Sequence, residues 1–318
     1  MKILYVIGSS RCGSTVLGNV LGELPGFFAA GEVRFLWERT VQGRLCGCRS
    51  PVATCQVWGK VLSLVRERGG ATPDEMLAAD RAALRPHHLA SLLMRRPGNV
   101  AGDPSLLRYA TTLRTTYEAL AEVTGTDIIV DTSKRPTNGA VARLLPGIEV
   151  KFLHLVRDPR GVAYSQSRSK PNPDGAPTGR MATLSPVMSC ALWSATNVMG
   201  DALRWRAGRR RSLLLLYDEL VARPERSIQR ILRLLEEERS PRIFTDDRTV
   251  RIGEHHTVAG NADRFLTGDV TFRSDDRWLH EMASADRRLV GMVAAPLILR
   301  YGMSLSPPAP AGREEIRR

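Results

Sequence analysis

The stretch Lys2-Ile-Leu-Tyr-Val-Ile7, followed by Gly8-Ser-Ser-Arg-Cys-Gly-Ser-Thr15, decides the fold. An apolar run rich in β-branched residues predicts a buried strand, and the glycines after it predict a turn into a helix over 14–23. The spacing matches the phosphate-binding loop G-x-x-x-x-G-K-[ST] except at the lysine, whose position holds Ser14, while a cation stands earlier at Arg11. The stretch therefore predicts an anion site at a helix N-terminus, but not that of an ordinary ATP or GTP hydrolase.

Short apolar runs and helical patterns continue to alternate along the chain. Strands are predicted at 2–7, 127–130, 150–156 and 212–217, and helices at 14–23, 137–145, 160–168 and 224–237. Continuous apolar strands are typical of a sheet covered on both faces, and strand–helix alternation favours parallel pairing with right-handed crossovers. We therefore expect an α/β fold, a three-layer doubly wound parallel sheet of the P-loop nucleotide-kinase type with a helical insertion.

Residues 38–126 depart from this alternation. They contain a cysteine-rich turn and helical patterns at 57–68, 74–84 and 104–123, which predicts a helical insertion rather than a separate domain. The segment 169–186 is rich in proline and glycine and predicts a lid-like loop, and 306–318 predicts a disordered tail. The chain then forms a single domain over 1–305.

The charge of the chain is strongly basic. Its 318 residues include 46 basic and 33 acidic ones, a formal net charge of +13. This balance suits nucleic acid, anionic lipid or an anionic small molecule, and basic patches would allow contact with a membrane surface. The basic cluster at 204–211 ends a predicted helix, where cations cap the helix dipole, so we do not expect a nucleic-acid partner. No run of about 18 apolar residues predicts a membrane span. The N-terminus predicts a strand rather than a signal peptide, so we expect a cytoplasmic protein.

A second candidate anion site follows the strand at 150–156. Arg157 ends this strand, Pro159 is a favourable first residue of a helix, and Ser165 lies two turns further on. The arginine and the serine could grip a second phosphate. The structural alternative is a helix capped by Asp158 with its arginines in solvent. The residues alone leave both interpretations open.

Together the two segments resemble the sulfotransferases that use 3′-phosphoadenosine 5′-phosphosulfate (PAPS). Ser10-Arg-Cys-Gly-Ser-Thr15 is similar to their 5′-phosphosulfate loop, although Cys12 replaces the commoner serine and no proline precedes Arg11. Arg157 with Ser165 is similar to their 3′-phosphate motif. The resemblance implies PAPS as co-substrate, adenosine 3′,5′-bisphosphate as product and no required metal. The loop residues that it implies for donor binding are Arg11, Cys12, Gly13, Ser14 and Thr15.

The resemblance extends to later segments of the chain. It implies that Tyr217 contacts the adenine, and that Lys134, just after a strand, approaches the transferred sulfonate. It also implies that Asn261 and Arg264 belong to a loop that closes over the nucleotide, with Arg264 as a further 3′-phosphate ligand. The acceptor side of the site would be built from 38–126 and 169–186.

A general base is also needed, because sulfuryl transfer removes a proton from the acceptor. Glu32, in Gly31-Glu-Val33, resembles a G-E-L segment of bacterial members, which implies a carboxylate that faces the anion loop. We predict Glu32 as the base and Arg11, supported by Lys134, as the group that stabilises the departing oxygen. The structural alternative for Glu32 is a helix-start residue that satisfies the dipole. His255 and His256 are rival bases.

The cysteine-rich turn allows two further interpretations. Cys46, Cys48 and Cys55 are spaced closely enough for a metal ion or a disulfide. Zinc normally takes four ligands, and with no histidine or fourth cysteine nearby in the sequence no metal site is predicted. A cytoplasmic chain should keep its thiols reduced. The resemblance implies that the segment shapes the acceptor pocket, and metal and disulfide both stay open.

The leading hypothesis is a sulfotransferase that moves a sulfuryl group from PAPS to a hydroxyl, or less readily an amine, by in-line displacement. The acceptor would be a small molecule or glycan, namely a carbohydrate, glycolipid or secondary metabolite. One alternative is a P-loop nucleotide kinase or GTPase-like protein, against which the missing lysine argues. The other is a basic nucleic-acid- or anion-binding protein, which the net charge suggests. The oligomeric state is left open.

Overall fold

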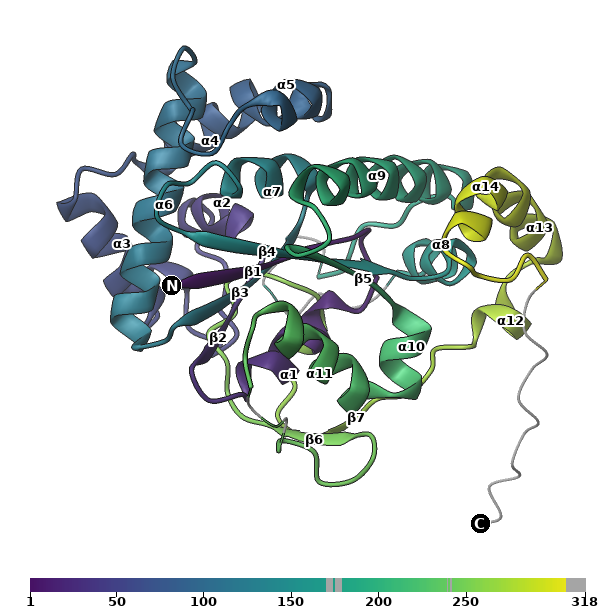
Figure 1. Cartoon of the computed structure of the whole chain (residues 1–318). Helices are drawn as coiled ribbons and strands as arrows, with labels where there is room; N and C mark the ends of the chain where they lie inside the picture. Colours follow the sequence, from purple (N-terminus) through teal and green to yellow (C-terminus); the bar gives the residue numbers. More distant parts are fainter. Residues whose placement is uncertain (170–173, 175–178, 239, 241, 307–318) are drawn as a thin grey trace.

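A parallel β-sheet forms the centre of the computed structural model, which describes residues 1–169, 174, 179–238, 240 and 242–306 (Figure 1). Within these residues the sheet consists of β1 (Lys2–Ile7), β2 (Phe27–Gly31), β3 (Ile128–Lys134), β4 (Glu149–Val156) and β5 (Ser212–Leu216). The strand order is β2-β3-β1-β4-β5, and every pairing between these strands is parallel. The predicted α/β fold with a doubly wound parallel sheet is therefore confirmed.

Helices cover both faces of this sheet. In Figure 1, α1 (Ser14–Gly22) and α11 (Pro224–Leu234) lie below the sheet, whereas α7 (Pro136–Ala142) and α9 (Pro186–Ala207) lie above it. Side chains alternate between the two faces of a strand. Along β1, Leu4 and Val6 accordingly pack into the core on the α1 side, and Ile3, Tyr5 and Ile7 pack into the core on the α7 side. An unbroken apolar strand is thus what a central strand of this sheet requires.

Two strands of this sheet differ from the prediction, and two short strands outside it, at 249–252 and 268–271, were not predicted. The edge strand β2 was not predicted, because Phe27-Phe-Ala-Ala-Gly31 is short and ends in residues that do not favour strands, and its pairing with β3 outweighs that propensity. β3 continues to Lys134 instead of ending at residue 130. The buried carboxylate of Asp131 accepts hydrogen bonds from the Tyr117 hydroxyl at 2.6 Å and the Ser133 peptide N–H at 2.8 Å. These bonds allow a polar residue inside a buried strand.

The segment 38–126 is mainly helical. Its helices are α2, which begins just before it at Leu36 and ends at Val41, α3 (Trp58–Glu67), α4 (Pro73–Ala83), α5 (Leu89–Met94) and α6 (Pro104–Thr124). Both α3 and α4 pack against α6. A capping box between Thr72 and Glu75 begins α4, and the Asp103 side chain caps α6. Such local signals explain why these helix boundaries lie close to the predicted ones.

The remaining elements come after β4 along the chain. α8 (Pro159–Ser167) follows β4, and α10 (Tyr217–Ala222) follows β5 directly. β6 (Thr249–Ile252) pairs antiparallel with β7 (Gly268–Thr271), and after them come α12 (Trp278–Glu281), α13 (Ser284–Val293) and α14 (Ala295–Arg300). α13 packs against both α8 and α9.

Two sequence-based expectations fall partly or wholly on residues that the structure does not describe. Part of the predicted lid at 169–186, namely 170–173 and 175–178, lies outside the described residues, as does the predicted tail from 307 to 318. A helix long and apolar enough to cross a membrane is not found among the described residues.

Candidate functional site

The carboxyl ends of the sheet strands converge on a cavity of about 520 Å³. Open parallel sheets bind ligands at this edge, beside the position where neighbouring strands connect in opposite directions. In this sheet that position is β1, because the chain leaves it for β2 and β3 on one side and later adds β4 and β5 on the other. Each strand end contributes to the cavity wall: Arg11 and the following loop from β1, Glu32 from β2, Lys134 from β3, Arg157 from β4 and Tyr217 from β5.

The loop after β1 presents a helix N-terminus to this cavity. Gly13 is the N-cap of α1 and has φ 94°, in the left-handed region that favours glycine. A Cβ at Gly13 would lie 2.9 Å from the Tyr217 ring, so only glycine lets this ring pack on the loop. No side chain in the described part of the chain caps α1. Its positive end, with Ser14 and Thr15, therefore borders the cavity as an anion site.

Arg11 supplies a cation beside this helix end. Its Nη1 donates a hydrogen bond of 2.6 Å to Asn261 Oδ1, and its Nη2 contacts Met181 Sδ at 3.2 Å. The Asn261 peptide N–H in turn donates to Thr15 Oγ1 at 3.1 Å. Burial lowers the pKa of Arg11, and the nearby Arg157 charge adds to this effect, but an arginine still remains a cation at neutral pH. The loop after β6 is thus bonded to the anion loop at two points.

Glu32 and Lys134 form another part of the cavity wall. Glu32 is 8% exposed, and its carboxylate lies 2.6 Å from Lys134 Nζ and 3.6 Å from an Arg34 nitrogen. The Glu32 peptide N–H donates to the Ala259 carbonyl at 3.1 Å, which holds the end of β2 in place. A carboxylate and an ammonium group therefore meet at the cavity surface, next to the anion loop.

Arg157 and Ser165 form a second polar group at the cavity. Arg157 is 7% exposed, and its guanidinium lies 4.5 Å from the centre of the Tyr217 ring. It donates to the Arg11 carbonyl at 3.2 Å and pairs with the Asp275 carboxylate at 3.2 Å. Asp158 does cap α8 through the Arg160 peptide N–H, as the structural alternative required, but Arg157 points into the cavity rather than into solvent.

The structure brings most of the predicted site residues together. Those that line the cavity are Arg11, Gly13, Ser14, Thr15, Glu32, Lys134, Arg157, Ser165, Tyr217 and Asn261. The Cys12 side chain lies in the core beneath the loop instead, where burial raises the pKa of its thiol. Arg264 is 2% exposed, pairs with Asp174 at 2.8 Å and donates to the Gly260 carbonyl at 3.0 Å. Neither side chain is among the lining residues.

Some lining residues were not predicted. Asp275 and Met181 reach the cavity from irregular segments that carry no recognisable motif. For Asp275 the one available signal is an acidic pair, Asp275-Asp276, in a basic chain. Burial raises the pKa of Asp275, but hydrogen bonds from Arg277 and the charge of Arg157 outweigh it, so that the pKa is lowered. Asp275 is therefore ionised at neutral pH.

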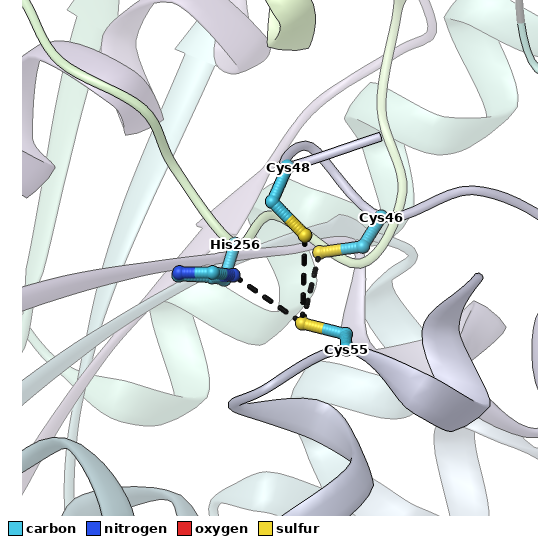
Figure 2. Close-up of side chains that lie close together, drawn as sticks. All are labelled: Cys46, Cys48, Cys55 and His256. Carbon is cyan, nitrogen blue, oxygen red and sulfur yellow. Dashed lines mark hydrogen bonds between the residues drawn. The ribbon is translucent and has the colours of Figure 1, made fainter. Parts of the chain in front are cut away.

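The two histidines considered as rival bases lie elsewhere. His255 pairs with Glu23 at 3.0 Å, and His256 lies against the cysteine-rich turn. The expectation that no fourth ligand is near Cys46, Cys48 and Cys55 was therefore wrong, because a residue distant in the sequence is close in space (Figure 2). Neither histidine is among the residues that line the cavity.

Known proteins are similar to this chain in sequence and in structure. A family model described as "Sulfotransferase family" matches residues 4–241. The chain is similar in structure to the "Sulfotransferase Domain from the Synechococcus PCC 7002 Olefin Synthase", with 18% identity, a TM-score of 0.51, and coverage of 93% of this chain and 94% of that chain. It is also similar to the "Sulfotransferase Domain from the Curacin Biosynthetic Pathway", with 15% identity, a TM-score of 0.53, and coverage of 96% and 99%.

At 18% and 15% sequence identity, these two structural similarities show the fold of the chain. A search of curated proteins found no significant match. The family model, however, spans most of the chain, from β1 to beyond the end of α11, and includes both candidate anion-binding segments. On this evidence the protein belongs to the sulfotransferase family.

Proposed function

We propose that the cavity binds PAPS and that the protein transfers its sulfuryl group to a hydroxyl of a small-molecule or glycan acceptor. One observation carries this proposal: two separate cationic anion sites, the Arg11 loop and the Arg157–Ser165 pair, line the same cavity. The Tyr217 ring contacts both, since it packs on Gly13 and lies under the Arg157 guanidinium. A nucleotide with phosphates on both its 5′ and 3′ positions fits such a pair of sites.

The donor groups divide between these sites. The α1 N-terminus, Arg11, Ser14 and Thr15 would hold the 5′-phosphosulfate, and Arg157 with Ser165 would hold the 3′-phosphate. Tyr217 would stack against the adenine. Burial raises the pKa of the Tyr217 hydroxyl, so this side chain stays neutral and adds no charge beside the phosphates.

In the chemical step the acceptor oxygen attacks the sulfur in line with the bridging oxygen. The new O–S bond forms as the bond between sulfur and the bridging oxygen breaks, and adenosine 3′,5′-bisphosphate leaves with that electron pair. Arg11, with Lys134, would stabilise the charge that develops on the departing oxygen. Glu32 would take the proton of the acceptor hydroxyl. Its contact with Lys134 places the base and the cation side by side, at 2.6 Å.

The acceptor is proposed to lie next to Glu32. Val33–Phe35 and α2 follow this residue directly, and Arg34 stacks on the Phe35 ring at 3.8 Å. These residues begin the segment that we expect to supply acceptor contacts. A carbohydrate, a glycolipid or a secondary metabolite with a free hydroxyl remains the proposed class, with an amine as the less favoured acceptor.

The experiment separates donor binding from turnover. Glu32→Gln keeps the size of the side chain but removes the base, so turnover should fall about 100-fold or more while adenosine 3′,5′-bisphosphate binds as before. Transfer of labelled sulfate from PAPS to a panel of hydroxyl acceptors measures turnover, and calorimetry measures binding. Glu225→Gln, at an exposed position on α11 and outside the lining residues, is the matched control and should change neither quantity.

Three other outcomes would contradict the proposed base or the proposed donor. Unchanged turnover in Glu32→Gln would remove Glu32 from the role of base. Wild-type protein that binds Mg-ATP but not adenosine 3′,5′-bisphosphate would favour a P-loop kinase. Salt-dependent DNA binding without any preference for this nucleotide would favour the basic binding protein.

A further inference from the structure

We propose that one Zn²⁺ ion is bound by four residues, Cys46, Cys48, Cys55 and His256. This ion would hold the cysteine-rich turn against the loop after β6, at a point that precedes Asn261. The ligand atoms of these side chains all lie within 4.8 Å of one another, and Figure 2 shows the sulfur atoms and the imidazole turned toward a common centre. Three thiolates and one imidazole are a ligand set typical of structural zinc. The inference goes beyond the proposed function, because none of these residues is among those lining the donor cavity.

The distances agree with tetrahedral coordination. Cys55 Sγ lies 3.6 Å from Cys46 Sγ, 3.7 Å from Cys48 Sγ and 3.3 Å from His256 Nδ1. Two sulfurs that each lie about 2.3 Å from one tetrahedral zinc ion are about 3.8 Å apart. Bonded sulfurs would be about 2.0 Å apart, and a disulfide would leave one of the three thiols unpaired. The arrangement therefore favours a shared metal over a disulfide.

The surroundings fit a closed structural site. Cys46 and Cys55 are 0% and 1% exposed, while Cys48 and His256 are half-buried. The side-chain amide of Gln56 lies 3.1 Å from His256 Nε2. With its oxygen turned toward this ring nitrogen, the amide would orient the imidazole so that Nδ1 faces the metal.

The backbone explains why distant segments meet here. The Gly47 peptide N–H donates to the Thr257 carbonyl at 2.9 Å, and the Trp58 indole N–H donates to the His256 carbonyl. A Cβ at position 47 would lie only 2.4 Å from the His255 carbonyl oxygen, so glycine between the two cysteines permits this close approach. The Val258 peptide N–H also donates to the Ala30 carbonyl at 2.9 Å. The cluster and its flanking backbone thus join the turn to β2, the strand that ends just before Glu32.

Four protein ligands complete a tetrahedral shell and leave no open position for a substrate, so the ion would act in folding rather than in the reaction. Each thiol loses its proton to solvent as it binds zinc. Zinc would hold the segment that precedes Asn261, and Asn261 in turn holds Arg11. The predicted consequence of removing the ion is a less stable protein with a looser wall beside the anion loop.

The first test measures metal in the full-length wild-type protein, purified without chelator and with any affinity tag removed. Elemental analysis should give about one zinc per chain. After chelation, titration with Zn²⁺ against a chromophoric chelator should restore one site, and Co²⁺ should give the intense visible bands and thiolate charge transfer of tetrahedral coordination by sulfur. A wild-type chain that neither carries zinc nor takes it up would overturn the proposal. So would a mass two hydrogens lower than that of the reduced chain, with loss of titratable thiols, because it would establish a disulfide.

Variants of the ligands provide the second test. His256→Ala should lose zinc, whereas His256→Cys, which restores a fourth ligand, should retain it. The matched control is Cys190→Ser, because Cys190 is a buried cysteine on α9 outside the cluster, and this variant should keep one zinc. The half-buried His256 is chosen so that the variants fold; a circular dichroism spectrum like that of the wild type checks this. Equal zinc content in His256→Ala and wild type would exclude His256 as a ligand.

The result is independent of the proposed reaction. Binding of adenosine 3′,5′-bisphosphate is measured on the same preparations. Wild-type protein that binds this nucleotide but takes up no zinc overturns the metal site alone. Wild-type protein that binds zinc but not the nucleotide overturns the donor alone. Chelation should also lower the thermal midpoint of the wild type by several degrees, and added Zn²⁺ should restore it.

Discussion

Arg157 shares its guanidinium between the carbonyl oxygen of Arg11 and the carboxylate of Asp275, both at 3.2 Å. Asp275 also bonds Arg277 and stays ionised at neutral pH because its pKa is lowered. The proposed 3′-phosphate would therefore compete with a carboxylate for the same cation. The site carries its own internal anion, which would limit how tightly such a nucleotide binds.

Replacing this carboxylate should strengthen nucleotide binding. Asp275→Asn removes a negative charge near the proposed 3′-phosphate, and a charge pair at a partly exposed position is worth about 1 kcal/mol, so the affinity for adenosine 3′,5′-bisphosphate should rise about fivefold. Calorimetry at pH 7 and pH 8 should give nearly the same gain, because Asp275 is ionised at both values and the phosphates of the nucleotide lie above their second pKa of about 6. Asp276→Asn is the control. Weaker binding by Asp275→Asn would mean that Asp275 positions Arg157 instead.

At this scale the sequence predicted the residues that belong to motifs. Arg11, Arg157 and Tyr217 were predictable because each follows a short apolar run and parallel strands end at the same edge. Asp275 and the proximity of His256 to Cys55 were not. Their positions depend on how irregular segments fold back on the sheet, and a separation of 201 residues between Cys55 and His256 leaves no local signal.

At the scale of elements, the contact between α9 and α14 depends on a buried carboxylate. Asp201 on α9 is 12% exposed, and its oxygens lie 2.7 Å from Arg300 Nε and 3.1 Å from the Tyr301 hydroxyl. His154 of β4 is 3.6 Å away. Burial raises the pKa of Asp201, but the proximity of His154 and the hydrogen bonds from Arg300 and Tyr301 outweigh it and lower the pKa to about 2. The ionised carboxylate thus ties the last helix to the core.

Neutralising this carboxylate should destabilise the fold in a pH-dependent way. The folded pKa lies below the ordinary value of 3.8, so the stabilisation is present above that value and is lost as pH falls toward 2. Asp201→Asn should lower the free energy of unfolding by about 2 kcal/mol at pH 7. In denaturant titrations the difference from wild type should stay constant down to about pH 5 and narrow below it. Asp247→Asn, at an exposed loop, is the control, and an equal loss there would refute the assignment.

Helices and strands also differ in how well they can be predicted from the sequence. Caps and prolines marked α4, α6 and α8, and these helices begin close to the predicted residues. The edge strand β2 was missed because Ala29, Ala30 and Gly31 carry little strand propensity. Its existence follows from pairing with β3, a long-range interaction. Glu32 was nevertheless singled out, from its resemblance to a family segment rather than from its place at a strand end.

At the scale of the whole molecule, the net charge of +13 should draw an anionic donor toward the cavity. We predict that the association rate of adenosine 3′,5′-bisphosphate falls several-fold between about 20 and 200 mM NaCl, because salt shortens the reach of the protein's field. Stopped-flow measurements test this, with adenosine, which has no charge, as the control. An equal salt dependence for both ligands would show that the net charge does not steer the donor.

Residues at the carboxyl end of every strand in the five-stranded sheet line the cavity, and those strands are far apart along the chain. A species in which any one strand has detached lacks part of the binding surface. A nucleotide that binds the cavity as proposed would therefore select the completely assembled sheet from all partly ordered forms, and mass action would shift the population toward it. Adenosine 3′,5′-bisphosphate would thus serve as a chemical chaperone for this chain, able to rescue destabilised variants whose lesions lie nowhere near the site.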